Sequence, residues 1–94
     1  MKETFYILLS NNGVQSVEKA EGELDSKNGI YYDKTASGWR ATDKYSGRAL
    51  AIAKNTKKEC QEAVSAIIDK FNEIRTQENY LQGYINFMEL VESK

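Results

Sequence analysis

The end of the chain, residues 56–94, carries an apolar residue every three or four positions and contains no proline. This spacing predicts an α-helix. One unbroken helix over residues 57–92 would be about 54 Å long at about 1.5 Å per residue. A domain of this length has a radius of gyration of only about 12–13 Å. The helix must therefore either break near residues 76–79 and pack back on the domain, or stay whole and pair with another helix.

The segment 76–79 is polar but contains neither glycine nor proline, and the apolar spacing continues beyond Glu78. We therefore expect an unbroken or mildly bent helix whose distal end forms a dimer seam of the coiled-coil type. The apolar residues of this distal end are the candidate partner-binding residues: Tyr80, Leu81, Tyr84, Ile85, Phe87, Met88 and Val91. A monomer rarely exposes so large an apolar patch, so we expect another protein or a second copy of the chain to cover it.

Before this helix, alternating apolar residues separated by turn residues predict an antiparallel sheet of about five strands. The strands are expected at residues 4–10, 14–20, 30–34, 39–43 and 48–54, with a loop over 21–29. The run Thr56-Lys-Lys-Glu59 has the spacing of a capping box and marks the start of the helix. The fold class is therefore α+β. We expect the chain to form a single domain over residues 1–94, with the sheet in 1–55 and the helical tail in 56–94.

Alternation along the strands also predicts which residues meet in the core. In the last strand, Leu50 and Ile52 share one face and the small residues Ala49, Ala51 and Ala53 share the other. The sheet residues expected to meet the helix are Ile30, Tyr32, Trp39, Ala41, Leu50 and Ile52. The helix residues expected to meet them are Val64, Ile67, Phe71 and Ile74.

The composition argues against several classes of chemistry. The chain has no histidine, which removes the commonest metal ligand and the side chain that titrates nearest neutrality. Its one cysteine, Cys60, lies on the apolar side of the helix, so we expect it to be buried and the compartment to be reducing. The apolar run at residues 5–9 is too short for a signal peptide or a membrane span. We expect a cytoplasmic protein without a cofactor, a metal, membrane contact or enzymatic activity.

Two charged groups remain as candidate sites. The acidic residues Glu18, Glu21, Glu23 and Asp25 do not have the spacing of a calcium loop, and we expect them to be solvated. Basic residues alternate with aromatic ones further along, a combination that suits phosphate contact and base stacking. The candidate nucleic-acid-binding residues are Tyr31, Arg40, Lys44, Tyr45 and Arg48.

Four short motifs carry a family resemblance: Gly29-Ile-Tyr-Tyr, Gly38-Trp-Arg, Lys44-Tyr-Ser-Gly47 and Thr56-Lys-Lys-Glu59. Over residues 29–60 the chain resembles the arm-binding (AP2-like) domains of phage integrases, in which a three-stranded sheet and a helix bind DNA. The resemblance implies that Arg40, Lys44 and Arg48 face a DNA groove. The strand Ala-Leu-Ala-Ile-Ala differs from the basic strand of that family. More loosely, the chain resembles small orphan proteins of phages and mobile elements, many of which bind and block a host protein.

These observations favour a non-catalytic protein-binding module, a homodimer of the phage or mobile-element inhibitor or adaptor kind. A duplex-DNA-binding protein that uses the basic face of the sheet is the alternative. A third hypothesis is a small-molecule sponge, in which sheet aromatics at a dimer interface stack on a nucleotide.

Overall fold

The computed structural model describes residues 2–94. Five strands precede two helices: β1 Glu3–Asn11, β2 Val14–Asp25, β3 Ile30–Thr35, β4 Gly38–Asp43, β5 Ala49–Lys54, α1 Lys57–Ile74 and α2 Glu78–Glu92. The strands form one antiparallel sheet in the order β1-β2-β3-β4-β5, so each strand pairs with the next along the chain. The α+β class and the five-stranded antiparallel sheet are confirmed.

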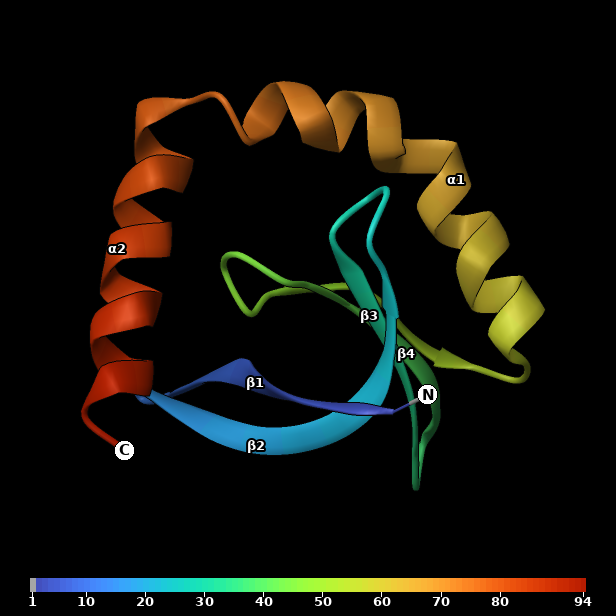
Figure 1. Cartoon of the computed structure of the whole chain (residues 1–94), viewed down its shortest axis with the longest axis horizontal. Helices are drawn as coiled ribbons and strands as arrows, with labels where there is room; N and C mark the ends of the chain where they lie inside the picture. Colours follow the sequence, from blue (N-terminus) through green and yellow to red (C-terminus); the bar gives the residue numbers. More distant parts are fainter. Residues whose placement is uncertain (1) are drawn as a thin grey trace.

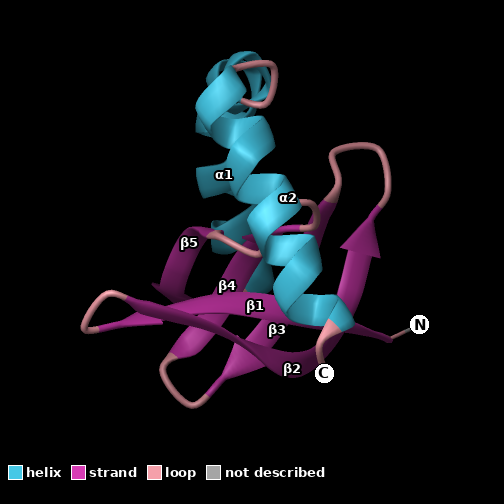
Figure 2. Ribbon diagram, turned by 90° about the vertical axis from the view of Figure 1, so that its left-hand side faces the viewer, coloured by secondary structure: helices cyan, strands magenta, loops and turns pink. Residues whose placement is uncertain are grey.

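The sheet curls, and the long strand β2 makes the bend (Figures 1 and 2). Residues 14–22 of β2 pair with β1, whereas residues 23–25 pair with β3. A Cβ atom on Gly22 would overlap the Tyr32 carbonyl oxygen and lie 3.0 Å from Phe5 Cε1. Glycine therefore permits the close approach at this point. The expected loop over residues 21–29 is wrong for its first half, because β2 continues to Asp25.

The curl brings β1 to the opposite end of the sheet. The Leu8 N–H in β1 donates a hydrogen bond of 2.8 Å to the Gly47 carbonyl oxygen, which lies between β4 and β5. The alternation of β1 predicts a strand buried on both faces and away from an edge. Instead β1 has only β2 as a strand neighbour, and Leu9 is 38% exposed.

The expectation of one long C-terminal helix is wrong. The chain changes direction between α1 and α2, which lie along different sides of the sheet (Figure 1). The Thr76 hydroxyl donates to the Glu73 carbonyl oxygen at 2.7 Å, and Gln77 is extended, with φ −82° and ψ 148°. The break occurs without glycine or proline, and it allows α2 to pack back on its own sheet.

The core consists of two clusters on opposite faces of β3. The first lies under α1 and contains Ile30, Tyr32, Ala41, Ala51, Cys60 and Val64, with Trp39, Leu50, Ala63 and Ile68 partly buried against it. The second contains Phe5, Ile7 and Tyr31, with Ala20 and Leu24 at its margin. The predicted burial of Cys60 and of the sheet residues Ile30, Tyr32 and Ala41 is confirmed.

Three predicted core residues are instead exposed: Ile52 by 62%, Ile67 by 41% and Ile74 by 37%. The β4–β5 pairing shifts register between Trp39 and Thr42, and Ala53 has a positive φ of 58°. Such β-bulges re-aim the following side chains. They place Ala51 in the core in place of Ile52. The expectation that the three alanines of β5 share one face is wrong, because Ala51 is buried whereas Ala49 and Ala53 are exposed.

The start of α1 follows its sequence signal. The Glu59 N–H donates to the Thr56 hydroxyl oxygen at 3.1 Å, and the Asn55 N–H donates to Glu59 Oε2 at 3.3 Å. The capping box is confirmed, with Glu59 reaching one residue further back than the usual motif.

Candidate functional site

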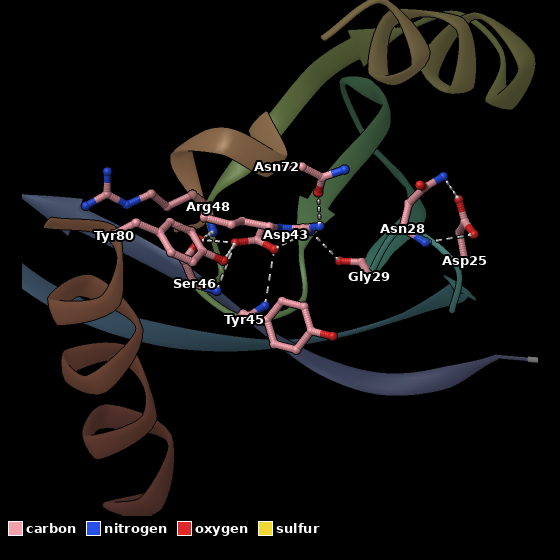
Figure 3. Close-up of polar contacts among 10 residues, drawn as sticks. Asp25, Asn28, Gly29, Asp43, Tyr45, Ser46, Arg48, Asn72 and Tyr80 are labelled. Atoms are coloured by element: carbon pink, nitrogen blue, oxygen red, sulfur yellow. Dashed lines mark hydrogen bonds and ion pairs between the residues drawn. The ribbon is translucent and has the colours of Figure 1, made fainter. Parts of the chain in front are cut away.

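The site centres on Asp43, a fully buried residue at the end of β4. Its Oδ2 accepts hydrogen bonds from the Tyr80 hydroxyl at 2.5 Å and from the Ser46 hydroxyl at 2.6 Å (Figure 3). Its Oδ1 accepts a hydrogen bond of 2.8 Å from Arg75 Nη2. One carboxylate therefore holds the end of α1, the start of α2 and the turn after β4 together. These partners offset the cost of burying its charge.

The groups around Asp43 are themselves fixed in place. The Arg75 guanidinium lies 4.8 Å from the centre of the Phe71 ring and 5.4 Å from that of Tyr45. Burial raises the pKa of Tyr80, and the hydrogen bond to Asp43 raises it further. A tyrosine held in this way keeps its proton and acts as a hydrogen-bond donor. The arrangement fixes the positions of the two helices.

Phe87 fixes the distal part of α2 to the sheet. Its side chain is only 4% exposed, and a Cβ atom added to Gly47 would overlap its ring. Gly47 also has a positive φ of 71°, a backbone conformation that glycine adopts without strain. Glycine at this position therefore lets α2 lie against the turn between β4 and β5.

The opposite flank of α2 is largely open to water in the described part of the chain. Leu81 is 49% exposed, Tyr84 37% and Ile85 48%, and Met88 continues the line half-buried. These positions follow the i, i+3, i+4, i+7 spacing with which an amphipathic helix presents one apolar face. We call Leu81, Tyr84, Ile85 and Met88 the α2 ridge.

The structure places the predicted partner-binding residues in three different surroundings. Tyr80 and Phe87 contact the chain's own sheet and turn, through Asp43 and Gly47. Val91 is half-buried beside β1, and the α2 ridge contains the remaining residues. The sequence pattern identified the apolar arc of this helix, but it did not show that half of the arc packs internally.

The predicted nucleic-acid-binding residues do not share one surface. Arg40 pairs with Asp33 through two hydrogen bonds, from Nε at 3.0 Å and from Nη2 at 2.5 Å. Tyr31, Lys44 and Tyr45 meet at the base of α2, and Arg48 is exposed on the other side of that helix, near Gly83. Tyr31 is itself 7% exposed and stacks on Phe5, with ring centres 4.4 Å apart.

Tyr31, Lys44 and Tyr45 border a hollow of about 280 Å³ between β1, the turn after β4 and α2. Its aromatic walls are Phe5, Tyr6, Tyr31, Tyr45, Tyr84 and Phe87. We call this space the tyrosine hollow. In its wall the Tyr45 and Tyr84 rings meet edge to face, with centres 6.4 Å apart. Tyr84 and Met88 belong both to its wall and to the α2 ridge.

The acidic residues expected to be solvated lie on β2. Glu23 forms an ion pair with Lys57 at the start of α1, and the hydrogen bond and charge of Lys57 lower the pKa of Glu23. Within residues 2–94, no group of three or more His, Cys, Asp or Glu side chains has an arrangement that could hold a metal ion. No helix of this described part has the length and apolar character needed to cross a bilayer.

Sequence reasoning missed the two residues that organise the site, Asp43 and Arg75. A local signal for Asp43 exists, because aspartate often begins a turn by accepting bonds from the residues that follow. Here its carboxylate accepts from the N–H groups of Tyr45 and Ser46. No local signal links Asp43 to Arg75, since 32 residues separate them. Comparison with protein-family models, curated proteins and solved structures finds no match for the chain.

Proposed function

We propose that this chain is a non-catalytic protein-binding module of the phage or mobile-element inhibitor or adaptor kind. In this proposal it forms a homodimer through the α2 ridge. The observation that supports it is the exposure of Leu81 and Ile85, each about half open to water, on a helix whose other side is docked. Tyr80 and Phe87 hold that helix in place, so the ridge is presented on a fixed support.

A second copy suits this ridge because a twofold dimer joins the same patch of both chains. Each leucine or isoleucine side chain that becomes fully buried contributes about 1.5–3 kcal/mol, and the dimer buries the residues of both copies. The polar side of α2, which carries Gln82, Asn86 and Glu89, is exposed and remains in water in such a pair. The charged and amide side chains there limit further growth of the assembly.

Light scattering across a range of protein concentrations tests the proposal. We expect the native chain to approach a dimer as its concentration rises, and Leu81→Asp and Ile85→Asp to stay monomeric. Asn86→Asp is the matched control, since it adds the same charge to the polar side of α2. Circular dichroism should show that all three variants are folded. A native chain that is monomeric at every concentration, or ridge variants that still form dimers, would overturn the homodimer.

Substitution is a sharper test than removal of α2. A chain ending at Arg75 would lose the Tyr80 bond to Asp43 and the Phe87 packing as well as the ridge. If the shortened chain did not associate, the cause could be either its lower folding stability or the loss of the interface.

Duplex-DNA binding remains the alternative, and the exposed cations Lys44 and Arg48 near the turn after β4 favour it. Binding through these residues should weaken steeply with salt, because each phosphate contact releases counterions. Lys44→Ala and Arg48→Ala should each reduce the salt slope by about 1. An affinity that is independent of salt, or unchanged in both variants, would exclude this alternative.

A further inference from the structure

The tyrosine hollow has a buried tyrosine in its wall. Tyr31 lines the hollow and is only 7% exposed, and its ring stacks on that of Phe5. Burial raises the pKa of Tyr31, and the charge of Glu3 adds to the effect, so the hydroxyl keeps its proton. A protonated hydroxyl can donate a hydrogen bond, so a ligand that accepts one suits this residue.

The charge at the hollow determines which charge a ligand bound there should carry. Lys44 is its only charged lining residue within the described chain, and its ammonium lies 5.8 Å from the centre of the Tyr45 ring. Aromatic walls alone would also suit a cation such as a quaternary ammonium group. Lys44 repels such a cation and attracts an anion. Glu3, the acid that acts on Tyr31, does not line the hollow.

We propose that the tyrosine hollow binds a small planar aromatic anion. The ring lies among the aromatic side chains of β1, β3 and α2, and its carboxylate or phosphate group meets the Lys44 ammonium and the Tyr31 hydroxyl. The volume of about 280 Å³ lies near the lower end of the range for small-molecule sites. It suits a ligand no larger than a nucleoside monophosphate.

This site goes beyond the proposed dimerisation, which uses the outer side of α2. The two share Tyr84 and Met88, whereas Lys44 and Tyr31 belong only to the hollow. Failure of the homodimer proposal can be told apart from failure of the ligand-site proposal. Light scattering on Leu81→Asp tests the dimer alone, because this substitution leaves Lys44 and Tyr31 unchanged.

Titration calorimetry on the full chain tests the site with three aromatic anions: phenyl phosphate, benzoate and adenosine monophosphate. The neutral compound adenosine, inorganic phosphate and choline serve as comparisons. We expect at least one aromatic anion to bind, and the three comparison compounds to bind at least about tenfold more weakly. Preference among the three anions distinguishes a phosphate from a carboxylate and a nucleotide from a simpler ring.

Two variants locate the binding. Lys44→Ala should weaken it by about tenfold or more, as expected for the loss of a bond to a charged group. Tyr31→Phe keeps the stacked ring, removes only the hydroxyl, and should weaken binding several-fold. Lys58→Ala, an exposed lysine on α1, is the control and should have no effect. No binding of any aromatic anion, equal binding of choline or inorganic phosphate, or unchanged affinity in Lys44→Ala would overturn the proposal.

Discussion

At the scale of single residues, the carboxylate of Asp43 joins the end of α1 to the start of α2. It accepts hydrogen bonds from Ser46 in the turn, from Arg75 after α1 and from Tyr80 in α2. The bonds from Arg75 and Tyr80 link segments that no local sequence rule would join. The side chain is completely buried, so its charge depends on these partners instead of water.

Replacement of Asp43 by asparagine should destabilise the fold by about 3–5 kcal/mol. The change leaves the Arg75 guanidinium, 15% exposed, without its opposing charge. Urea unfolding followed by circular dichroism measures the loss. Asp69→Asn, an exposed position on α1, is the control and should change stability by no more than about 0.5 kcal/mol. Equal effects of the two substitutions would show that the buried pair contributes little.

Stability should fall at alkaline pH because the folded chain holds several tyrosines in their protonated form. Burial, with the charge of Asp25 next in importance, raises the pKa of Tyr32 to about 12, and the pKa of Tyr80 is raised above its ordinary value. In the unfolded chain these hydroxyls ionise near pH 10. Their contribution is therefore complete below about pH 10 and is lost as the pH rises toward 12.

Tyr80→Phe isolates one part of this dependence. At neutral pH the variant should be less stable by about 1.5–3 kcal/mol, the usual range for a hydrogen bond to a charged group. Above about pH 10 the difference from the native chain should shrink, because only the native chain gains by ionising Tyr80 when it unfolds. Urea unfolding across the pH range measures both quantities. A difference that stays constant to pH 12 would contradict the raised pKa of Tyr80.

At the scale of secondary-structure elements, the sequence predicted those features whose causes are local. Apart from the end of β2, the strands begin and end close to their expected positions, because the turns at Asn12-Gly13 and around Gly47 use residues that accept positive φ. The start of α1 also has a local cause, the capping hydrogen bond from the Glu59 N–H to the Thr56 hydroxyl oxygen. In the candidate site, the apolar arc of α2 was also readable from its spacing.

The remaining features depend on contacts between distant residues. The break after Arg75 is stabilised by Asp43, which lies in a different element, and no glycine or proline marks it. The inward position of Ala51 and the outward position of Ile52 follow from bulges in the β4–β5 pairing. A regular alternation cannot anticipate such bulges. The tyrosine hollow appears only when β1 curls under α2, so its lining was not predictable as a set.

Gly47→Ala tests whether α2 is docked through Phe87. The added Cβ atom would overlap the Phe87 ring and lie 2.9 Å from the Leu8 nitrogen. Gly13→Ala is a close control, since Gly13 also has a positive φ, of 80°, but nothing lies within 4 Å of its Cβ position. We expect about 1–2 kcal/mol of destabilisation at Gly13 from backbone strain. At Gly47, overpacking should add about 1–3 kcal/mol more. Thermal unfolding of both variants measures this difference, and equal losses would contradict the docking.

The start of α2 lacks a side-chain cap and should be improved by one. Gln77 occupies the N-cap position in an extended conformation, and its side chain makes no capping hydrogen bond. Gln77→Ser places a short hydroxyl where it can accept from the first amides of α2, which should stabilise the fold by about 0.5–1 kcal/mol. Gln82→Ser, on the exposed side of the same helix, should be neutral or slightly destabilising. Urea unfolding compares the two, and a loss of stability at Gln77 would argue against this helix start.

At the scale of the whole molecule, breaking the helix replaces one long rod by a compact particle. The Cα radius of gyration is 12.9 Å and the longest extent is 32 Å, well below the length of one continuous helix. The two helices pack on different parts of the curled sheet, α1 against β3, β4 and β5 and α2 against β2 (Figure 1). The first core cluster is held by α1, and Phe87 is the one fully packed residue of α2. The tertiary packing that stabilises α1 is therefore more extensive than that which stabilises α2.

Hydrogen exchange should reveal this inequality. We expect amides of α2 to exchange through an opening of lower free energy than those of β3 and β4, because α2 has fewer buried apolar contacts. Exchange measured by NMR over a series of low urea concentrations separates local from global opening. If α2 and β3 exchange with the same free energy in the native chain, the helix belongs to the same cooperative unit as the sheet.

The position of Cys60 gives the chain a built-in reporter of its own unfolding. Cys60 lies on α1, and its side chain is fully buried between this helix and the sheet. Burial raises the pKa of the thiol, so a thiol-specific reagent meets almost no thiolate while the fold is closed. Cys60 reacts only when the core opens, so its labelling rate reports the frequency of opening without any engineered tag. A partner or small molecule that binds the closed form would lengthen the waiting time. Mass spectrometry of Cys60 labelling could therefore screen for a binding partner or for a small-molecule ligand.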